Sequence, residues 1–163
     1  MAPKLSARVL RHVLNLWPPF LFAGIHVAEL AADWSRARVE LRMRPWNRNY
    51  VGTHFGGSLF AMTDPFWMLL MLHAIGEDHI VWDRAAEISF EKPGRGKVVA
   101  EFSLDPATVA AIRAETADGD KHLRWFDTDI LDAGGDVVAR VRKQLYVRRK
   151  RPRGERAPMA PAG

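Results

Sequence analysis

The sequence contains no cysteine among its 163 residues. The chain therefore cannot form a disulfide, use a thiolate as a nucleophile or hold zinc through sulfur. The histidines His54, His73 and His79 lack the spacing of a zinc motif, and no cluster of carboxylates accompanies them. We therefore expect no metal and no other cofactor. The absence of cysteine also suits a reducing cytoplasm.

Long hydrophobic runs are also missing. The longest uncharged apolar run, residues 65–76, contains a histidine and is too short to cross a bilayer. Basic residues followed by apolar ones give residues 1–32 some likeness to an export signal, but Pro18-Pro19, His26 and Glu29 interrupt it. We expect a cytoplasmic protein without membrane insertion.

Excess charge is confined to one end of the chain. The formal net charge is +5, and residues 148–156 hold six Lys or Arg against one Glu. We expect a single domain over residues 1–147 and a basic, disordered tail over residues 148–163. Because the strands lack a stripe of alternating basic and aromatic residues, we expect no specific nucleic-acid partner.

Hydrophobic periodicity predicts an α+β protein. The first helix, Leu5 to Leu16, is expected to end at Pro18-Pro19 and to pack on the domain rather than to anchor it in a membrane. Its apolar side would comprise Leu5, Val9, Leu10, Val13 and Leu16. A buried central helix is expected over residues 57–75 and a third helix over residues 106–117. Strands are expected over residues 25–32, 36–44, 80–91, 97–104, 121–131 and 137–147.

This order of elements predicts an antiparallel six-stranded sheet wrapped around the central helix. Such a sheet leaves edges uncovered, which favours pairing with a second copy as a homodimer or a dimer of dimers.

The stretch from Asn49 to Asp64 carries the strongest functional signal. A polar loop ends at Gly56-Gly57, and Asp64 follows seven residues after Gly57. Glycines at a loop-to-helix junction leave backbone N–H groups open to a carbonyl oxygen or an oxyanion. Seven residues are about two helical turns, which places Asp64 on the same helix face roughly 10 Å away. Spacing alone does not decide whether the two groups act together.

In this stretch, and in the order of elements from Ile25 to Val147, the chain resembles hotdog-fold acyl-CoA thioesterases of the phenylacetyl-CoA type and a related family of uncharacterised function. Asn49, Gly56, Gly57 and Asp64 fall at the offsets of the thioesterase motif. The resemblance implies that the two glycine N–H groups polarise the thioester carbonyl. It implies that Asp64 is the base or nucleophile, acting across a dimer interface, and that Asn49 positions water.

The sequence departs from that motif at one position. Phe55 stands where the thioesterases have a histidine, and His54 lies one residue earlier. His54 is either a displaced equivalent or the histidine function is absent. The first reading favours hydrolysis of an acyl-CoA or related thioester, and the second favours a protein that binds or senses acyl ligands without turnover. An enoyl-CoA hydratase ranks lower, because no paired Asp-His signature is evident.

A structural reading of Asp64 competes with the catalytic one. Asp64 precedes Pro65, and an aspartate N-cap followed by proline is a common helix start, as also expected at Asp105-Pro106. On this reading the central helix is kinked or restarted at Pro65. In either case we expect the carboxylate to be poorly solvated by the surrounding apolar side chains, which are Phe60, Met62, Phe66 and Trp67.

Further residues are candidates for contact with the substrate: Phe55, Phe60, Thr63, Arg84 and Lys143. Alternation places Arg84 on one face with Ile80, Trp82, Ala86, Ile88 and Phe90, and Lys143 interrupts an apolar face of the last strand. Inward cations of this kind bind a phosphate, pair with Asp64 or pair with another carboxylate such as Asp127 or Asp129.

Overall fold

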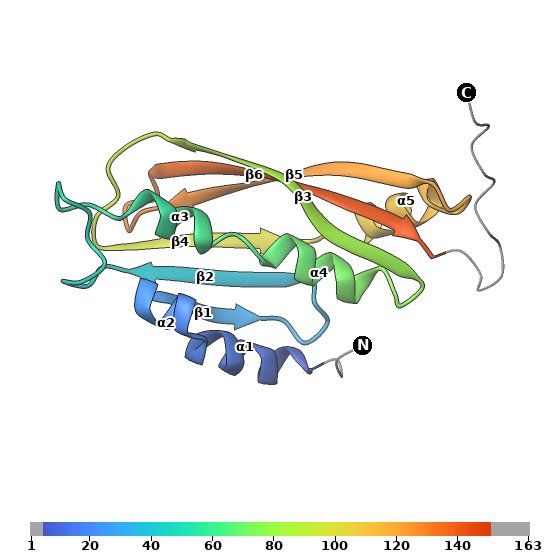
Figure 1. Cartoon of the computed structure of the whole chain (residues 1–163), viewed down its shortest axis with the longest axis horizontal. Helices are drawn as coiled ribbons and strands as arrows, with labels where there is room; N and C mark the ends of the chain where they lie inside the picture. Colours follow the sequence, from blue (N-terminus) through green and yellow to red (C-terminus); the bar gives the residue numbers. More distant parts are fainter. Residues whose placement is uncertain (1–4, 151–163) are drawn as a thin grey trace, which may run out of the picture.

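The computed structural model describes residues 5–150, which form one six-stranded antiparallel sheet with helices against it (Figure 1). The strand order is β1-β2-β4-β5-β6-β3, so β1 and β3 are the two edges. The expected fold class is confirmed. The strands are β1 (Ile25–Leu30), β2 (Arg36–Arg42), β3 (His79–Phe90), β4 (Lys97–Ser103), β5 (Lys121–Leu131) and β6 (Val137–Arg149).

Five helices accompany the sheet. They are α1 (Ala7–Leu16), α2 (Pro18–Ala23), α3 (Gly56–Ala61), α4 (Phe66–Ala74) and α5 (Pro106–Glu115). Figure 1 shows α3 and α4 running one after the other along the sheet, whereas α1 and α2 lie beyond the β1 edge. The central helical segment is therefore the layer that the sheet wraps.

Aromatic rings join this layer to the sheet. The rings of Phe66 and Trp67 on α4 lie 5.1 and 5.5 Å from that of Phe102 on β4, and Trp67 also stacks on Phe126 at 4.7 Å. The Trp67 indole N–H donates to the Thr128 hydroxyl at 2.8 Å, so its polar group is satisfied. Burying each such ring contributes about 1.5–3 kcal/mol, which fixes the position of α4 on the sheet.

The expected continuous helix over residues 57–75 is interrupted. α3 ends at Ala61 and α4 begins at Phe66, because Pro65 lacks an N–H and cannot continue the helix. Asp64 does not cap α4: the N-cap is Pro65, and no side chain caps it. Asp105 shows the contrast, since its carboxylate accepts from the Ala107 N–H at 2.9 Å at the start of α5.

The N-terminal region differs from expectation in two ways. Pro18-Pro19 does end α1, but the prolines then occupy the first positions of α2, where a missing N–H costs nothing. The side of α1 that faces the domain is also not the expected one. Ala7 and Leu14 are buried, whereas four of the five expected residues are exposed: Leu5, Val9, Val13 and Leu16.

A β-bulge corrects the predicted face of β3. Asp83 pairs with Leu145 and Ala85 with Gln144, so Arg84 is an extra residue without a partner on β6. Because one residue is added, the inward face changes from odd to even numbers. Val81 and Asp83 face inward before the bulge, and Ala86, Ile88 and Phe90 do so after it. Arg84 is exposed, so its expected place among apolar residues is wrong.

Strand β6 continues to Arg149, two residues into the expected tail, and residues 151–163 lie outside the described part of the chain. Among residues 5–150, no helix is long and apolar enough to span a membrane.

Candidate functional site

The motif loop is organised by Asn49. Its amide oxygen accepts from the N–H groups of Val51 and Thr53 at 3.1 and 2.9 Å, and its amide nitrogen donates to the Thr53 hydroxyl and the His54 carbonyl at 2.7 and 3.2 Å. These four bonds use the full capacity of the side chain. In this structure Asn49 therefore shapes the loop, and its role in positioning water stays a prediction.

His54 points into the protein and is only 3% exposed. Its Nε2 lies 2.9 Å from the Gly96 carbonyl, and its backbone N–H donates to the Gly94 carbonyl at 3.0 Å. Nδ1 is buried and has no hydrogen-bond partner among the described groups. Burial lowers the pKa of His54 because it disfavours the charged imidazolium, although the bond to Gly96 opposes this. The ring thus fastens the motif loop to the β3–β4 turn.

Two phenylalanine rings cover the glycine pair. A Cβ on Gly56 would lie 2.9 Å from the Phe90 ring, and one on Gly57 would overlap the Phe55 ring. Any other residue at either position would displace an aromatic side chain. Both rings are more than half exposed, so a larger residue would move a ring and not the backbone.

A pocket of about 430 Å³ lies between the motif loop and the end of β3. This volume is within the usual range for small-molecule sites. Asn49, His54 and Gly56 line it together with Phe90 and Val51, but neither Asp64 nor Lys143 does.

Asp64 belongs to a second cluster, centred on Lys143. The Lys143 Nζ lies 2.6 Å from Asp64 Oδ1 and 3.5 Å from Asp83 Oδ2, with the Phe60 ring centroid at 5.9 Å. The lysine side chain is 3% exposed and that of Asp64 is 61% exposed. The expected inward lysine and its pairing with Asp64 are present, whereas the expected poor solvation of Asp64 is wrong for this chain. A buried cation thus holds an exposed carboxylate in one place.

Asp83 was missed in the sequence because strict alternation cannot reveal a bulge. The bulge at Arg84 leaves Asp83 facing Lys143. Burial raises the pKa of Asp83; the Lys143 charge opposes this rise and the Asp64 charge adds to it. Two carboxyl groups with different solvent access therefore share one lysine.

Other candidates lie outside these two clusters. The Thr63 hydroxyl is buried and donates to the Phe60 carbonyl at 2.8 Å, so it is engaged within the helix. Asp127 pairs with Arg142 on the outer face of the sheet, which corrects its suggested pairing with Lys143. No group of three or more metal-ligating side chains occurs in the part of the chain that the structure describes.

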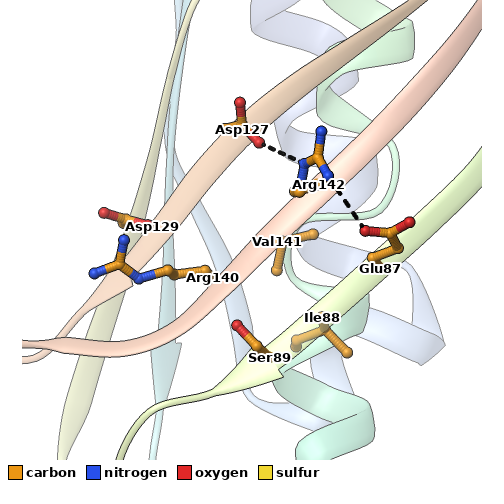
Figure 2. Close-up of a pocket in the computed structure, with 8 residues that line it drawn as sticks. All are labelled: Glu87, Ile88, Ser89, Asp127, Asp129, Arg140, Val141 and Arg142. Carbon is orange, nitrogen blue, oxygen red and sulfur yellow. Dashed lines mark hydrogen bonds and ion pairs between the residues drawn. The ribbon is translucent and has the colours of Figure 1, made fainter.

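Figure 2 shows the outer-face hollow over β3, β5 and β6, where Arg142 lies between Asp127 and Glu87. Arg142 also lies 4.9 Å from the centroid of the Trp125 ring. Exposed pairs of this kind contribute little to stability, about 0–1 kcal/mol. Here opposite charges offset one another along the sheet.

Comparison with known proteins places the chain in a family. Residues 6–147 match the family described as a domain of unknown function, DUF4442. A probable thioesterase of unknown function from Pseudomonas aeruginosa superposes with a TM-score of 0.79 at 20% identity, over 90% of this chain and 97% of that chain. A protein of unknown function from Chlorobaculum tepidum gives a TM-score of 0.69 at 14% identity, over 88% and 94% of the two chains.

A thioesterase from Haemophilus influenzae superposes with a TM-score of 0.64 at 13% identity, over 93% of this chain and 96% of that chain. At these identities the structures show the fold alone. Comparison with curated protein sequences finds no match. The chain belongs to the DUF4442 family and has the hotdog fold.

Proposed function

We propose that this protein hydrolyses an acyl thioester such as an acyl-CoA to a free acid and a thiol. The observation that carries the proposal is the exposed Asp64 carboxylate, fixed by the buried Lys143 at 2.6 Å in a thioesterase-superfamily fold. A carboxylate held in one place is suited to act repeatedly on a bound substrate.

In the proposed reaction, Asp64 accepts a proton from water as the water oxygen attacks the thioester carbonyl carbon. The carbon–sulfur bond then breaks, and the leaving thiolate takes the proton from Asp64, which returns to its carboxylate form. The Lys143 ammonium keeps the carboxylate oriented throughout. N–H groups of Gly56 and Gly57 would donate to the oxyanion that develops on the carbonyl oxygen. No cofactor takes part in these steps.

The proposal includes a second copy of the chain. Asp64 does not line the pocket that contains Gly56, so one chain does not bring the two halves of the site together. The resemblance to thioesterases puts the aspartate and the glycine pair on different subunits. Strand β3 supports this arrangement, since its outer edge has no partner strand among residues 5–150 and twelve residues available for pairing.

A second candidate is binding of an acyl ligand without turnover. His54 is engaged with the Gly96 carbonyl, and Phe55 occupies the position of the thioesterase histidine. Lys143 also occupies one oxygen of Asp64. These two contacts and the phenylalanine favour a site that holds a ligand but lacks a free base.

The test is release of free thiol from short, long and aromatic acyl-CoAs by the wild-type protein, Asp64→Asn and Lys143→Met. We expect kcat/KM to fall by about 100-fold in both variants, because each loses the positioned carboxylate. Asp127→Asn is the matched control, since it removes an exposed carboxylate on the outer face. Unfolding midpoints establish that all variants are folded.

Full activity in Asp64→Asn would contradict the proposed mechanism. Calorimetric binding of an acyl-CoA by a wild-type protein that releases no thiol would replace it with the second candidate.

A further inference from the structure

Exposed hydrophobic side chains concentrate on the N-terminal helices and on the loop between β2 and α3. Among residues 5–150, fourteen large hydrophobic residues are exposed, and eleven of them lie in or beside the N-terminal helices or in the loop between β2 and α3. Leu16 is 71% exposed, Phe22 69% and Trp46 69%. We call this set the helical surface: Leu5, Val9, Val13, Leu16, Trp17, Leu21, Phe22, Trp46, Tyr50, Val51 and Phe55.

The two segments of the helical surface are tied together by Asn47, which is buried. Its amide nitrogen donates to the Ala23 carbonyl at the end of α2 at 2.7 Å and to the Arg42 carbonyl at 2.9 Å, and its oxygen accepts from the Arg44 N–H. Figure 1 shows α2 and the loop after β2 at the same end of the sheet. The loop that carries Trp46 therefore has a fixed place beside α2.

The exposed side of α1 is not needed for its attachment to the domain. α1 is attached through Ala7 and Leu14, and through hydrogen bonds from Arg11 and Asn15 to β1. The opposite side carries residues at helical spacing that are all exposed: Leu5, Arg8, Val9, His12, Val13 and Leu16. Apolar and basic side chains thus share one outward face.

Charge on the helical surface has one sign. Residues 5–24 contain Arg8, Arg11 and His12, and residues 41–63 contain Arg42, Arg44 and Arg48, but neither segment contains an Asp or Glu. Among residues 5–150, Arg42 is the one of these basic residues that pairs with a carboxylate, that of Glu40. The outer face of the sheet differs, because there Arg140 lies beside Glu91 and Arg142 beside Asp127.

Pairing through β3 would leave the α1 part of the helical surface uncovered. α1 contacts β1, and β1 and β3 are opposite ends of the strand order. A second copy bound along β3 would therefore be a full sheet width away from α1. For the α1 and α2 part of the helical surface, the occupant that fits is therefore another partner, apolar and negatively charged.

We propose that the helical surface docks on an anionic lipid bilayer and lies in its interface without spanning it. Apolar side chains from α1 and α2 would enter the boundary between headgroups and acyl chains. Trp17, Trp46 and Tyr50 have the amphipathic rings favoured at that depth. Arg8, Arg44 and Arg48 would face the anionic headgroups.

Docking also bears on the substrate, and this step rests on the proposed function. Val51 belongs to the helical surface and also lines the pocket with Gly56. A docked protein would therefore hold the mouth of that pocket close to the lipid. The substrates that fit this placement are long-chain acyl thioesters dissolved in the bilayer.

The test is cosedimentation of the full chain with phosphatidylcholine vesicles that contain phosphatidylglycerol, without any substrate. We expect Leu21→Glu/Phe22→Glu to weaken binding by about tenfold or more, since two apolar anchors become anionic. Leu123→Glu, an exposed leucine on β5, should bind as the wild type does. Asp64→Asn should also bind normally, which separates docking from catalysis.

Three outcomes would overturn the proposal. The wild type could fail to bind phosphatidylglycerol vesicles. Binding that persists in Leu21→Glu/Phe22→Glu and disappears in high salt would assign it to basic residues alone. A smaller assembly of the double variant in sedimentation, with its unfolding midpoint intact, would show that a second copy covers the helical surface.

Discussion

The two edge strands of the sheet, β1 and β3, differ in whether another part of the chain binds their outer edge. At β1, Asn15 accepts from the Val27 N–H at 2.7 Å and donates to the Val27 carbonyl at 3.1 Å, while Arg11 donates to the Ala28 carbonyl. At β3, no strand or helix side chain within residues 5–150 takes the corresponding role. The sequence thus closes one edge with its own helix and leaves the longer edge available.

The β1 edge has a structural role, whereas the residues of the proposed chemistry lie along the β3 edge. The closed β1 edge has short strands and supports α1. The open β3 edge contains the bulge, supplies Asp83 to Lys143 and ends at Phe90 beside the glycine pocket. Groups that a second copy could complete therefore lie along the edge that is free to receive it.

The open edge can be disrupted by one charge. Trp82 on β3 is 48% exposed and stacks on Tyr146, and Leu123 lies on the other side of Tyr146 in the same row of the sheet. We expect Trp82→Asp to raise the dimer dissociation constant by about 30-fold, as loss of an aromatic anchor does. Analytical ultracentrifugation measures this constant.

Leu123→Asp is the control, because it places the same charge in the same row but away from the edge. Equal weakening by both variants would indicate pairing through the sheet face instead of the β3 edge.

A substitution in α1 can remove the hydrogen bonds that cover the β1 edge. We expect Asn15→Ala to lower the free energy of unfolding by about 2 kcal/mol, because it leaves the Val27 N–H and carbonyl groups unpaired. Urea denaturation measures the loss, and His12→Ala on the exposed side of α1 should change little. Equal stability of Asn15→Ala and the wild type would show that water replaces the asparagine and that α1 does not close this edge.

A smaller effect tests the loop beside the open edge. Burial lowers the pKa of His54 below the ordinary 6.5. Just below pH 6.5 His54 is therefore neutral in the folded protein, whereas in the unfolded chain it binds a proton. Its contribution is fully present above pH 6.5 and is lost as pH falls through the folded pKa. The free energy of unfolding should fall by at most about 1.4 kcal/mol per pH unit in that range.

His54→Gln should lack this part of the pH dependence and keep a donor for the Gly96 carbonyl. Urea titrations at several pH values from about 7 to about 5 compare the free energy of unfolding of the two proteins. Parallel profiles would mean that His54 does not hold its lowered pKa.

Sequence reasoning located the elements but not their local geometry. Alternating residues predicted six strands within a few positions, and the apolar run predicted the central helical layer. Pro18-Pro19 was interpreted only as a stop, although the same two prolines also begin α2. The buried side of α1 was misassigned because apolar residues occupy both sides of that helix.

The parts of the candidate site that follow from the position of a single residue in its own strand were predictable from the sequence. The interruption of an apolar strand by Lys143 gave its inward position and its possible pairing with Asp64. Asp83 could not be found, since only the pairing of β3 with β6 reveals the bulge. The inward turn of His54 depends on the β3–β4 turn, which is forty-two residues later in the chain.

The bulge at Arg84 also divides β3 into two segments in which the alternation of inward and outward side chains has opposite phase. Before it the inward positions are odd-numbered, and after it they are even-numbered. A continuous strand of the same length would turn Glu87 and Ser89 toward the helices and expose Ile88 and Phe90. Deleting Arg84 alone would keep both halves in phase with their present neighbours, so this position is where the strand can change length without exchanging its two faces.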